Sequence, residues 1–167
     1  MREAVIVSTA RTPLTKSHRG EFNATPGPQL AAYSVKAAVE RSGIEPELIE
    51  DLVMGCGYPE GITGKNIGRQ TALRAGLPLS VAGMVASRFC ASGLQSVAIA
   101  AGRIVAEGVP AMVAGGVESI SAIRAGNPAD IDPWLQEHKP DLYMAMIDTA
   151  DICLLYTSDA ADDSLRV

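Results

Sequence analysis

The sequence predicts an α/β fold, a mostly parallel sheet with helices on both faces. Short apolar, β-branched runs alternate with longer stretches in which apolar residues recur at helical spacing. The short runs are apolar at successive positions, as expected of strands that are buried on both faces. Glycines and prolines separate the runs from the helical stretches. A chain of 167 residues is long enough for one domain with a sizeable core.

Four strands are expected, joined by helices and right-handed crossovers. The strands are residues 4–8, 51–56, 81–87 and 111–114. The first helix follows Pro28, a residue that a first helical position tolerates, and stops at Gly43. The second covers about residues 66–75, and a long Ala-rich third helix covers residues 92–107.

Composition and charge exclude several classes of protein. A net charge of −5 argues against nucleic acid or an anionic membrane surface as the main partner. No apolar stretch is expected to span a bilayer, and the first apolar run is too short for a signal peptide. The cysteines, Cys56, Cys90 and Cys153, show neither a pairing pattern nor metal-ligand spacing. A reducing, cytoplasmic setting without a bound metal is therefore expected.

The carboxy-terminal part of the chain differs in character from residues 1–119, which are expected to form one domain. Residues 120–152 contain several prolines and acids and the only Trp, and they are interpreted as the start of a second subdomain. Residues 153–167 resemble the translation of an adaptor used in DNA library preparation, and they are predicted to be a non-native tail. The alternative is a genuine short polar terminus.

Cys90 is the candidate nucleophile. It stands at a predicted strand-to-helix turn, where the amino end of the following helix would favour a thiolate. The residues from Ala91 to Gly93 are small, so a thioester carbonyl could approach the sulfur, and the Cys90 N–H would point at a developing oxyanion. Spacing alone leaves open the commoner role of a small buried core residue. Cys56, beside glycines in a predicted strand, is interpreted as structural.

Three ordered motifs resemble the amino-terminal half of the thiolase family. They are residues 4–13, the turn at residues 88–95, and the Gly-Gly-Val-Glu-Ser-Ile-Ser run at residues 115–121. Ser87 departs from the family pattern, in which asparagine is common at that position. The resemblance covers about residues 2–152. It implies one βαβαβαββ half of a thiolase-like, five-layered αβαβα fold.

The same resemblance implies a ping-pong acyl transfer through an acylated Cys90. The reaction would be thiolysis of a 3-ketoacyl-CoA or Claisen condensation of acetyl-CoA. Coenzyme A thioesters would be the substrates, with no bound cofactor. The expected partners are acyl-CoA or CoA and further copies of the chain, as a homodimer or a dimer of dimers, with neither nucleic acid nor membrane.

The family completes this chemistry with a histidine, an asparagine and a second cysteine from carboxy-terminal motifs. None of those motifs occurs in this sequence. His18 and His138 are interpreted as solvated surface residues, and this fragment is expected to be inactive alone.

Six further residues receive roles beside Cys90. Met146 would line the acyl pocket, the alternative being core packing, and Ala145, directly before it, stands where short-chain biosynthetic members often have histidine. Gly93 is expected to be structural near the site, and the remaining four residues would shape the backbone beneath it. Gly115 and Gly116 would permit a close turn there, and Glu118 and Ser119 would orient it through hydrogen bonds.

Three other readings of the Cys90 segment are weighed against a thiolase. Other thiolase-fold condensing enzymes, such as ketoacyl synthases or hydroxymethylglutaryl-CoA synthases, share the nucleophile. A cysteine variant of a hydrolase elbow would need glycine at position 88, where this chain has Arg88. A non-catalytic acyl-CoA-binding half is the third alternative.

Overall fold

The computed structural model describes residues 2–123 and 131–154. The chain divides into two units, one ending at Ile123 and the other beginning at residue 124. This boundary lies four residues beyond the one placed after residue 119 from the sequence. Each unit is described by itself below.

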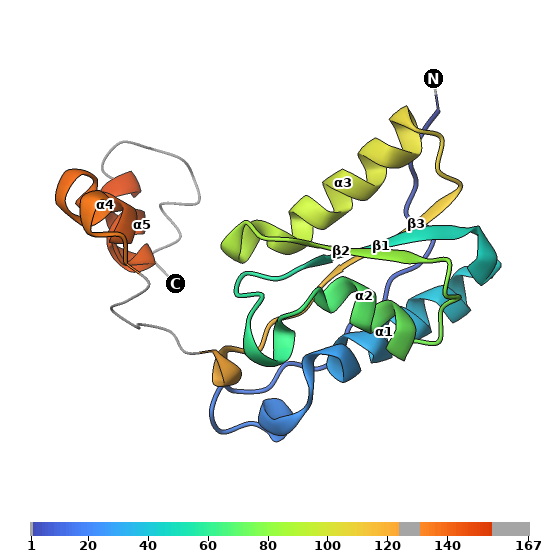
Figure 1. The fold of residues 1–167 in the computed structure, drawn as a ribbon, viewed down its shortest axis with the longest axis horizontal. Coiled ribbons are helices and arrows are strands. Elements are labelled where there is room, and N and C mark those ends of the chain that lie inside the picture. Colours follow the sequence, from blue (N-terminus) through green and yellow to red (C-terminus); the bar gives the residue numbers. More distant parts are fainter. Residues whose placement is uncertain (1, 124–130, 155–167) are drawn as a thin grey trace. The chain divides into compact units, whose positions relative to one another are not determined.

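The first unit is built on a three-stranded parallel sheet (Figure 1). Its strands are β1 (Ile49–Gly55), β2 (Ala82–Ala86) and β3 (Ala111–Gly116), in the order β2–β1–β3. β1 is therefore the central strand, and all of its residues except Glu50 are buried. The predicted α/β class with a parallel sheet is confirmed, and these three strands begin and end within two residues of their predicted bounds.

Helices cover both faces of the sheet, as predicted. Figure 1 shows α1 (Gly27–Ser42) and α2 (Ile67–Arg74) on one face and α3 (Ser92–Ala106) on the other. Gly43 ends α1 with a φ of 66°, the left-handed conformation that glycine adopts without strain. The Asn66 side chain caps α2 by accepting a hydrogen bond from the Arg69 N–H. The stop signal of α1 is therefore used as the sequence indicated, whereas the cap at Asn66 was not predicted.

The main apolar core lies between the sheet and the α1/α2 layer. Its fully buried members along β1 and its continuation include Leu52, Met54 and Cys56. The rest of the buried cluster comes from α1, α2, the other strands and their flanks: Ala31, Val35, Ile49, Ile67, Ala72, Leu77, Val81, Ala111 and Val117. None of these residues belongs to α3. Because side chains alternate along a strand, the intervening residues of β1 face α3.

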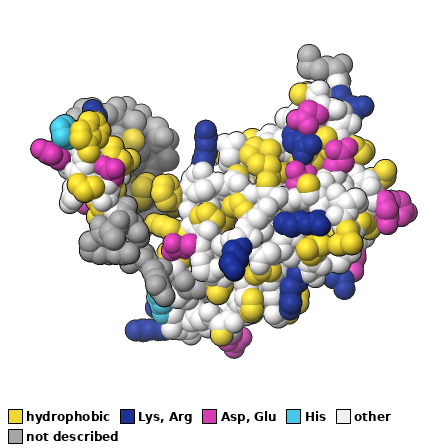
Figure 2. Space-filling view, viewed as in Figure 1, with side chains coloured by type: hydrophobic (Ala, Val, Ile, Leu, Met, Phe, Trp, Pro, Cys, Tyr) yellow, Lys and Arg dark blue, Asp and Glu magenta, His cyan; other side chains and the backbone are white. Residues whose placement is uncertain are grey.

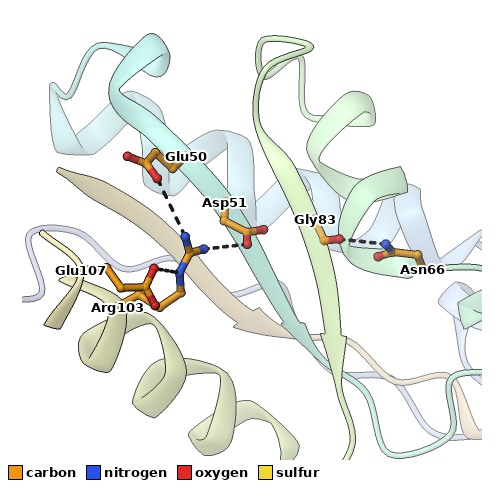
Figure 3. A network of polar contacts seen from close by, with 6 residues as sticks. All are labelled: Glu50, Asp51, Asn66, Gly83, Arg103 and Glu107. Atoms are coloured by element: carbon orange, nitrogen blue, oxygen red, sulfur yellow. Dashed lines mark hydrogen bonds and ion pairs between the residues drawn. The ribbon is translucent and has the colours of Figure 1, made fainter. Parts of the chain in front are cut away.

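Polar contacts join β1 to α3. Figure 3 shows Arg103 of α3 placed between Glu50, Asp51 and Glu107. Its guanidinium lies 2.9 Å from Asp51 Oδ2 and from Glu107 Oε2, and 3.9 Å from Glu50 Oε2. The pKa of Arg103 is raised, first by its hydrogen bond to Glu107. The guanidinium thus acts as a fixed positive charge that ties α3 to the sheet.

The predicted first strand, residues 4–8, does not form. The structure has neither strand nor helix in residues 2–16. Val5, Ile6 and Val7 are 71%, 74% and 59% exposed. An open crevice of about 980 Å³ lies between this segment and β3. β-Branched residues favour a strand where they pair and pack with a neighbouring strand. Residues 4–8 do not pair with β3, so the sheet has fewer strands than a βαβαβαββ layer.

Phe89–Ala106 is the one stretch of the described residues that is apolar and long enough to cross a membrane. The sequence was expected to contain no such stretch, so that expectation is wrong by length and composition. Only 17% of the stretch is buried in the structure. However, α3 packs against β1 and β3, and its Arg103 pairs with Asp51 of the sheet. These contacts identify α3 as a helix that covers the sheet. Apolar side chains are visible on the surface of the protein (Figure 2).

In the described part of the second unit, residues 131–154, the α-helices are α4 (Pro133–His138) and α5 (Met146–Leu154), and a 3-10 helix, Pro140–Tyr143, lies between them. Asp132 caps α4 by accepting a hydrogen bond from the Leu135 N–H. The Trp134 and His138 rings stack within α4, 4.5 Å apart. Cys153 and Leu154 belong to α5, whereas the rest of the predicted non-native tail lies outside the described residues.

Candidate active site

Cys90 lies between the sheet and the start of α3. After β2 ends at Ala86, residues Phe89–Ala91 form one 3-10 turn, and α3 begins at Ser92. Cys90 is exposed and forms no disulfide. The structure therefore places it at the strand-to-helix turn predicted from the sequence, at the amino end of a 15-residue helix.

Phe89, directly before Cys90, has the left-handed backbone conformation. Its φ is 47°, which is uncommon for an aromatic residue. The Ser92 hydroxyl holds the turn by accepting a hydrogen bond from the Arg88 N–H (2.8 Å) and donating one to the Phe89 carbonyl (2.6 Å). Ser92 is 3% exposed. The sequence suggested only that Ser92 is small, although a serine at a helix start often bonds nearby backbone groups.

Glycines set the distance between the sheet and the Cys90 segment. A Cβ at Gly55 would lie 2.4 Å from backbone atoms of Ser92, so no larger residue fits without displacing α3. The predicted turn at Gly115 and Gly116 is wrong, because both residues end the extended strand β3. A Cβ at Gly93 would meet nothing within 4 Å in this structure, so close packing does not require glycine there. Gly55 was not distinguished from the other glycines by its sequence context.

Glu118 follows β3 and binds the loop that follows β1. Its Oε2 accepts hydrogen bonds from the N–H groups of Gly57 (2.6 Å) and Tyr58 (3.2 Å), and its Oε1 accepts one from Cys56 Sγ (3.6 Å). The sequence predicted an orienting role for Glu118, but directed at its own Gly-Gly segment. Ser119 stands immediately before the short turn Ile120–Ala122.

Cys56 is a buried core thiol, whereas Cys90 is exposed. It is 1% exposed and belongs to the apolar cluster under α1 and α2. Burial, together with the negative charge of Glu118, raises the pKa of Cys56 from its ordinary value of 9.0 to about 11. A thiol held in this form is a poor nucleophile, which agrees with the structural role predicted for Cys56.

Both histidines are exposed, as expected from the sequence. The backbone N–H of His18 donates to Ser121 Oγ (2.8 Å). The ring nitrogen Nδ1 of His138 lies 2.9 Å from the Trp134 carbonyl oxygen. Met146 is the first residue of α5 and is 72% exposed. Its place in an acyl pocket stays a prediction, because Met146 and Cys90 belong to different units.

Comparison with known proteins gives a consistent result. Residues 4–156 match the family model described as thiolase, N-terminal domain. The chain is 40% identical over 152 residues to a 3-ketoacyl-CoA thiolase of Bacillus subtilis, covering 90% of this chain and 39% of that protein. It is 43% identical over 122 residues to an acetyl-CoA acetyltransferase of Cupriavidus necator, covering 73% of this chain and 30% of that protein. The chain thus spans well under half of the length of these relatives.

Proposed function

Because the chain belongs to the thiolase family, we propose that it is the nucleophile-bearing part of an acyltransferase that acts on coenzyme A thioesters. The observation that carries this proposal is the exposed Cys90 in a turn that Ser92 holds at the start of α3. Relatives that are named 3-ketoacyl-CoA thiolase and acetyl-CoA acetyltransferase support the same substrate class.

In the first half-reaction, the Cys90 thiolate attacks the carbonyl carbon of an acyl-CoA. The electron pair moves to the carbonyl oxygen and returns as the C–S bond to CoA breaks. The products are acylated Cys90 and CoA thiolate, which takes up a proton. A thioester suits this step because the thiolate of CoA is a good leaving group, and a covalent intermediate divides one difficult transfer into two easier ones.

In the second half-reaction, the acyl group passes to a second CoA-linked substrate. For condensation, the α-carbon of acetyl-CoA loses a proton and attacks the acyl-cysteine, which releases the Cys90 thiolate and forms a 3-ketoacyl-CoA. Thiolysis runs in the opposite order: in its first half-reaction Cys90 attacks the 3-keto carbon, and the C2–C3 bond breaks to release acetyl-CoA after protonation. Free CoA then takes the acyl group from Cys90. Both directions need an acid and a base beyond the residues assigned in this chain.

The backbone N–H of Cys90 is the proposed donor to the developing oxyanion. The neighbouring N–H of Ala91 donates to the Arg88 carbonyl (3.0 Å), and that of Ser92 donates to the Phe89 carbonyl. In the described part of the chain no hydrogen bond engages the Cys90 amide, so this amide is a donor of the turn that can serve a substrate. A donor fixed in place before the reaction stabilises negative charge without reorganisation.

The remaining features of the proposal concern the whole protein. We place it in the cytoplasm as a homodimer or dimer of dimers, active in fatty-acid metabolism, with Met146 against the acyl or pantetheine group of the substrate. The support is the resemblance to the thiolase family and the absence of a disulfide pattern among three cysteines.

Acylation of the chain tests the proposal directly. We expect incubation with acetyl-CoA to add one acetyl group, located on Cys90 by peptide mass mapping. Cys90→Ala should abolish the addition, and Cys153→Ala, which removes the other exposed cysteine, should leave it unchanged. We expect no steady-state cleavage of acetoacetyl-CoA by this chain alone. Absence of acetyl transfer to Cys90 would favour a non-catalytic acyl-CoA-binding half.

A further inference from the structure

We propose that Glu118 is a positioning residue for Cys90 and acts through the loop Cys56–Tyr58. This inference rests on the proposed role of Cys90 as the nucleophile. Glu118 follows β3, whereas Cys90 follows β2, and the central strand β1 lies between these two strands. The loop that follows β1 is therefore the connection between the two residues.

The ends of the three strands are joined by backbone hydrogen bonds. The Val117 N–H donates to the Gly55 carbonyl (3.0 Å), which keeps the chain after β3 beside the end of β1. The Cys56 N–H donates to the Ala86 carbonyl (3.0 Å), which keeps the end of β1 beside the end of β2. The carboxyl ends of parallel strands in an open α/β sheet are where ligands bind, so these contacts bring Glu118 to the same edge as Cys90.

Glu118 fixes the loop through its carboxylate. One oxygen, Oε2, accepts from two successive backbone N–H groups, those of Gly57 and Tyr58, at 2.6 and 3.2 Å. Hydrogen bonds to an ionised acceptor are about twice as strong as those between neutral groups. A Cβ at Gly57 would lie 2.8 Å from that oxygen, so glycine is the residue that lets the carboxylate approach. The loop is thereby tied to the end of β3.

The same loop supports the turn that carries Cys90. The Tyr58 ring meets the Phe89 ring edge-on, with centroids 5.7 Å apart. Ser87 Oγ donates to the Gly57 carbonyl (3.2 Å), and a Cβ at Gly57 would lie 3.4 Å from Phe89 Cα. Phe89 has a φ of 47°, and such a backbone persists only where its surroundings hold it. Glu118 thus holds the surface against which the strained residue before Cys90 packs.

Amide hydrogen exchange of the chain tests this connection without any substrate. In Glu118→Ala we expect the Ala91 and Ser92 amides to exchange about tenfold faster, the size expected from losing hydrogen bonds to a charged group. Glu118→Gln retains an oxygen acceptor, so exchange should stay within about threefold of the parent. Tyr58→Ala leaves Glu118 in place and should also accelerate Ala91 and Ser92. Glu40→Ala, at an exposed ion pair of α1, is the matched control and should change neither.

The outcomes separate this inference from the proposed function. The inference would be overturned if the Ala91 and Ser92 amides exchanged at the parent rate in Tyr58→Ala or in folded Glu118→Ala. It would also be overturned if these amides exchanged as fast in Glu118→Gln as in Glu118→Ala. Protection of the Leu52 and Val53 amides in β1 shows whether each variant is folded. If Glu118→Ala is unfolded, Tyr58→Ala and Glu118→Gln decide. Faster exchange in a chain whose Cys90 takes no acetyl group would support the positioning role and refute only the acyltransferase.

Acetylation of Cys90 gives the functional measurement. We expect the rate of acetyl transfer from acetyl-CoA to fall about tenfold in Glu118→Ala, because small displacements of a reacting group carry large rate penalties. Alkylation by iodoacetamide, which requires only an accessible thiolate, should change less than about twofold in the same variant. Equal losses in both reactions would indicate a general structural role and would overturn positioning.

Discussion

The two faces of the sheet are covered by helices in different ways. On the α1/α2 face, large apolar side chains such as Leu52, Met54 and Ile67 are at most 1% exposed. On the α3 face, the helix buries only Ser92, Ser96 and Ala100. Large apolar residues of α3 point outward instead, and Leu94 is 75% exposed. The first face is stabilised by packing, whereas the second is held by close backbone approach and a few polar contacts.

This difference has a functional meaning for Cys90. A helix seated on small residues approaches the sheet closely, and Gly55 lies directly under the first turn of α3. Ser96 Oγ donates to the Gly115 carbonyl (2.8 Å) and adds a fixed point one turn later. The face that is poorer in apolar packing is thus the one on which the start of α3, and with it the nucleophile, is placed by specific contacts.

A matched pair of leucine substitutions, one on each face of the sheet, has the largest expected difference in stability. We expect Leu52→Ala to lower the free energy of unfolding by about 2–5 kcal/mol, because it leaves a cavity in the core. Leu94→Ala on the other face should change it by less than about 0.5 kcal/mol, as at most exposed positions. Urea denaturation followed by circular dichroism measures both. A large loss in Leu94→Ala would mean that the outer face of α3 is buried in solution.

A pair of glycine substitutions tests how α3 is seated. We expect Gly55→Ala to cost about 1–3 kcal/mol, since the added methyl group overlaps the Ser92 backbone. Gly102→Ala in α3 meets nothing within 4 Å, so it should stabilise the protein by about 0.4–1 kcal/mol. Thermal and urea denaturation provide both values. A neutral Gly55→Ala would show that the helix can move away from the sheet without loss.

Arg103 provides the next largest effect. Its side chain is 28% exposed and lies 2.9 Å from the Asp51 carboxylate, which is 11% exposed. We expect Arg103→Met to destabilise the protein by about 1–2 kcal/mol, because a partly buried carboxylate loses its charged partner. The exposed pair Lys36–Glu40, 3.9 Å apart on α1, is the control. Lys36→Met should cost no more than about 0.5 kcal/mol in the same denaturation measurement.

Much of the fold could be predicted from the sequence, because helix ends and strand-to-helix turns depend on residues close together along the chain. Gly43 stops α1 through its own left-handed backbone, and the turn at Cys90 lies between an apolar run and an Ala-rich helix. Residues 4–8 show where such signals end. Their β-branched pattern indicates an extended backbone, but a strand also needs a partner, and the pattern contains no information about one.

The contacts around Cys90 were less predictable for a related reason. Glu118 and Gly57 are separated by 61 residues along the chain, and their hydrogen bond depends on the order of the strands. The close approach at Gly55 likewise depends on the packing of α3. The sequence therefore indicated the nucleophile and the helix that carries it, whereas the residues that hold its turn became visible only from the three-dimensional arrangement.

At neutral pH the smallest expected effect concerns the thiols of Cys56 and Cys90, one on each face. Exposed Cys90 should react with iodoacetamide in the native protein, whereas Cys56, which is 1% exposed, should react only on unfolding. Burial raises the pKa of Cys56 from 9.0 to about 11, so between these values the folded state retains a proton that the unfolded state has lost. Stability should therefore be unaffected by this thiol below about pH 9 and should fall as the pH rises toward 11.

Cys56→Ala isolates that contribution, because it removes the titrating group from the α1/α2 face while Cys90 stays in place. We expect the parent and the variant to differ by a constant amount in unfolding free energy up to about pH 9. Above that pH the parent should lose stability faster, and the two curves should converge. Urea denaturation at several alkaline pH values measures this convergence. Parallel curves up to pH 11 would mean that Cys56 titrates alike in both states and that the first face is open enough to solvate its thiolate.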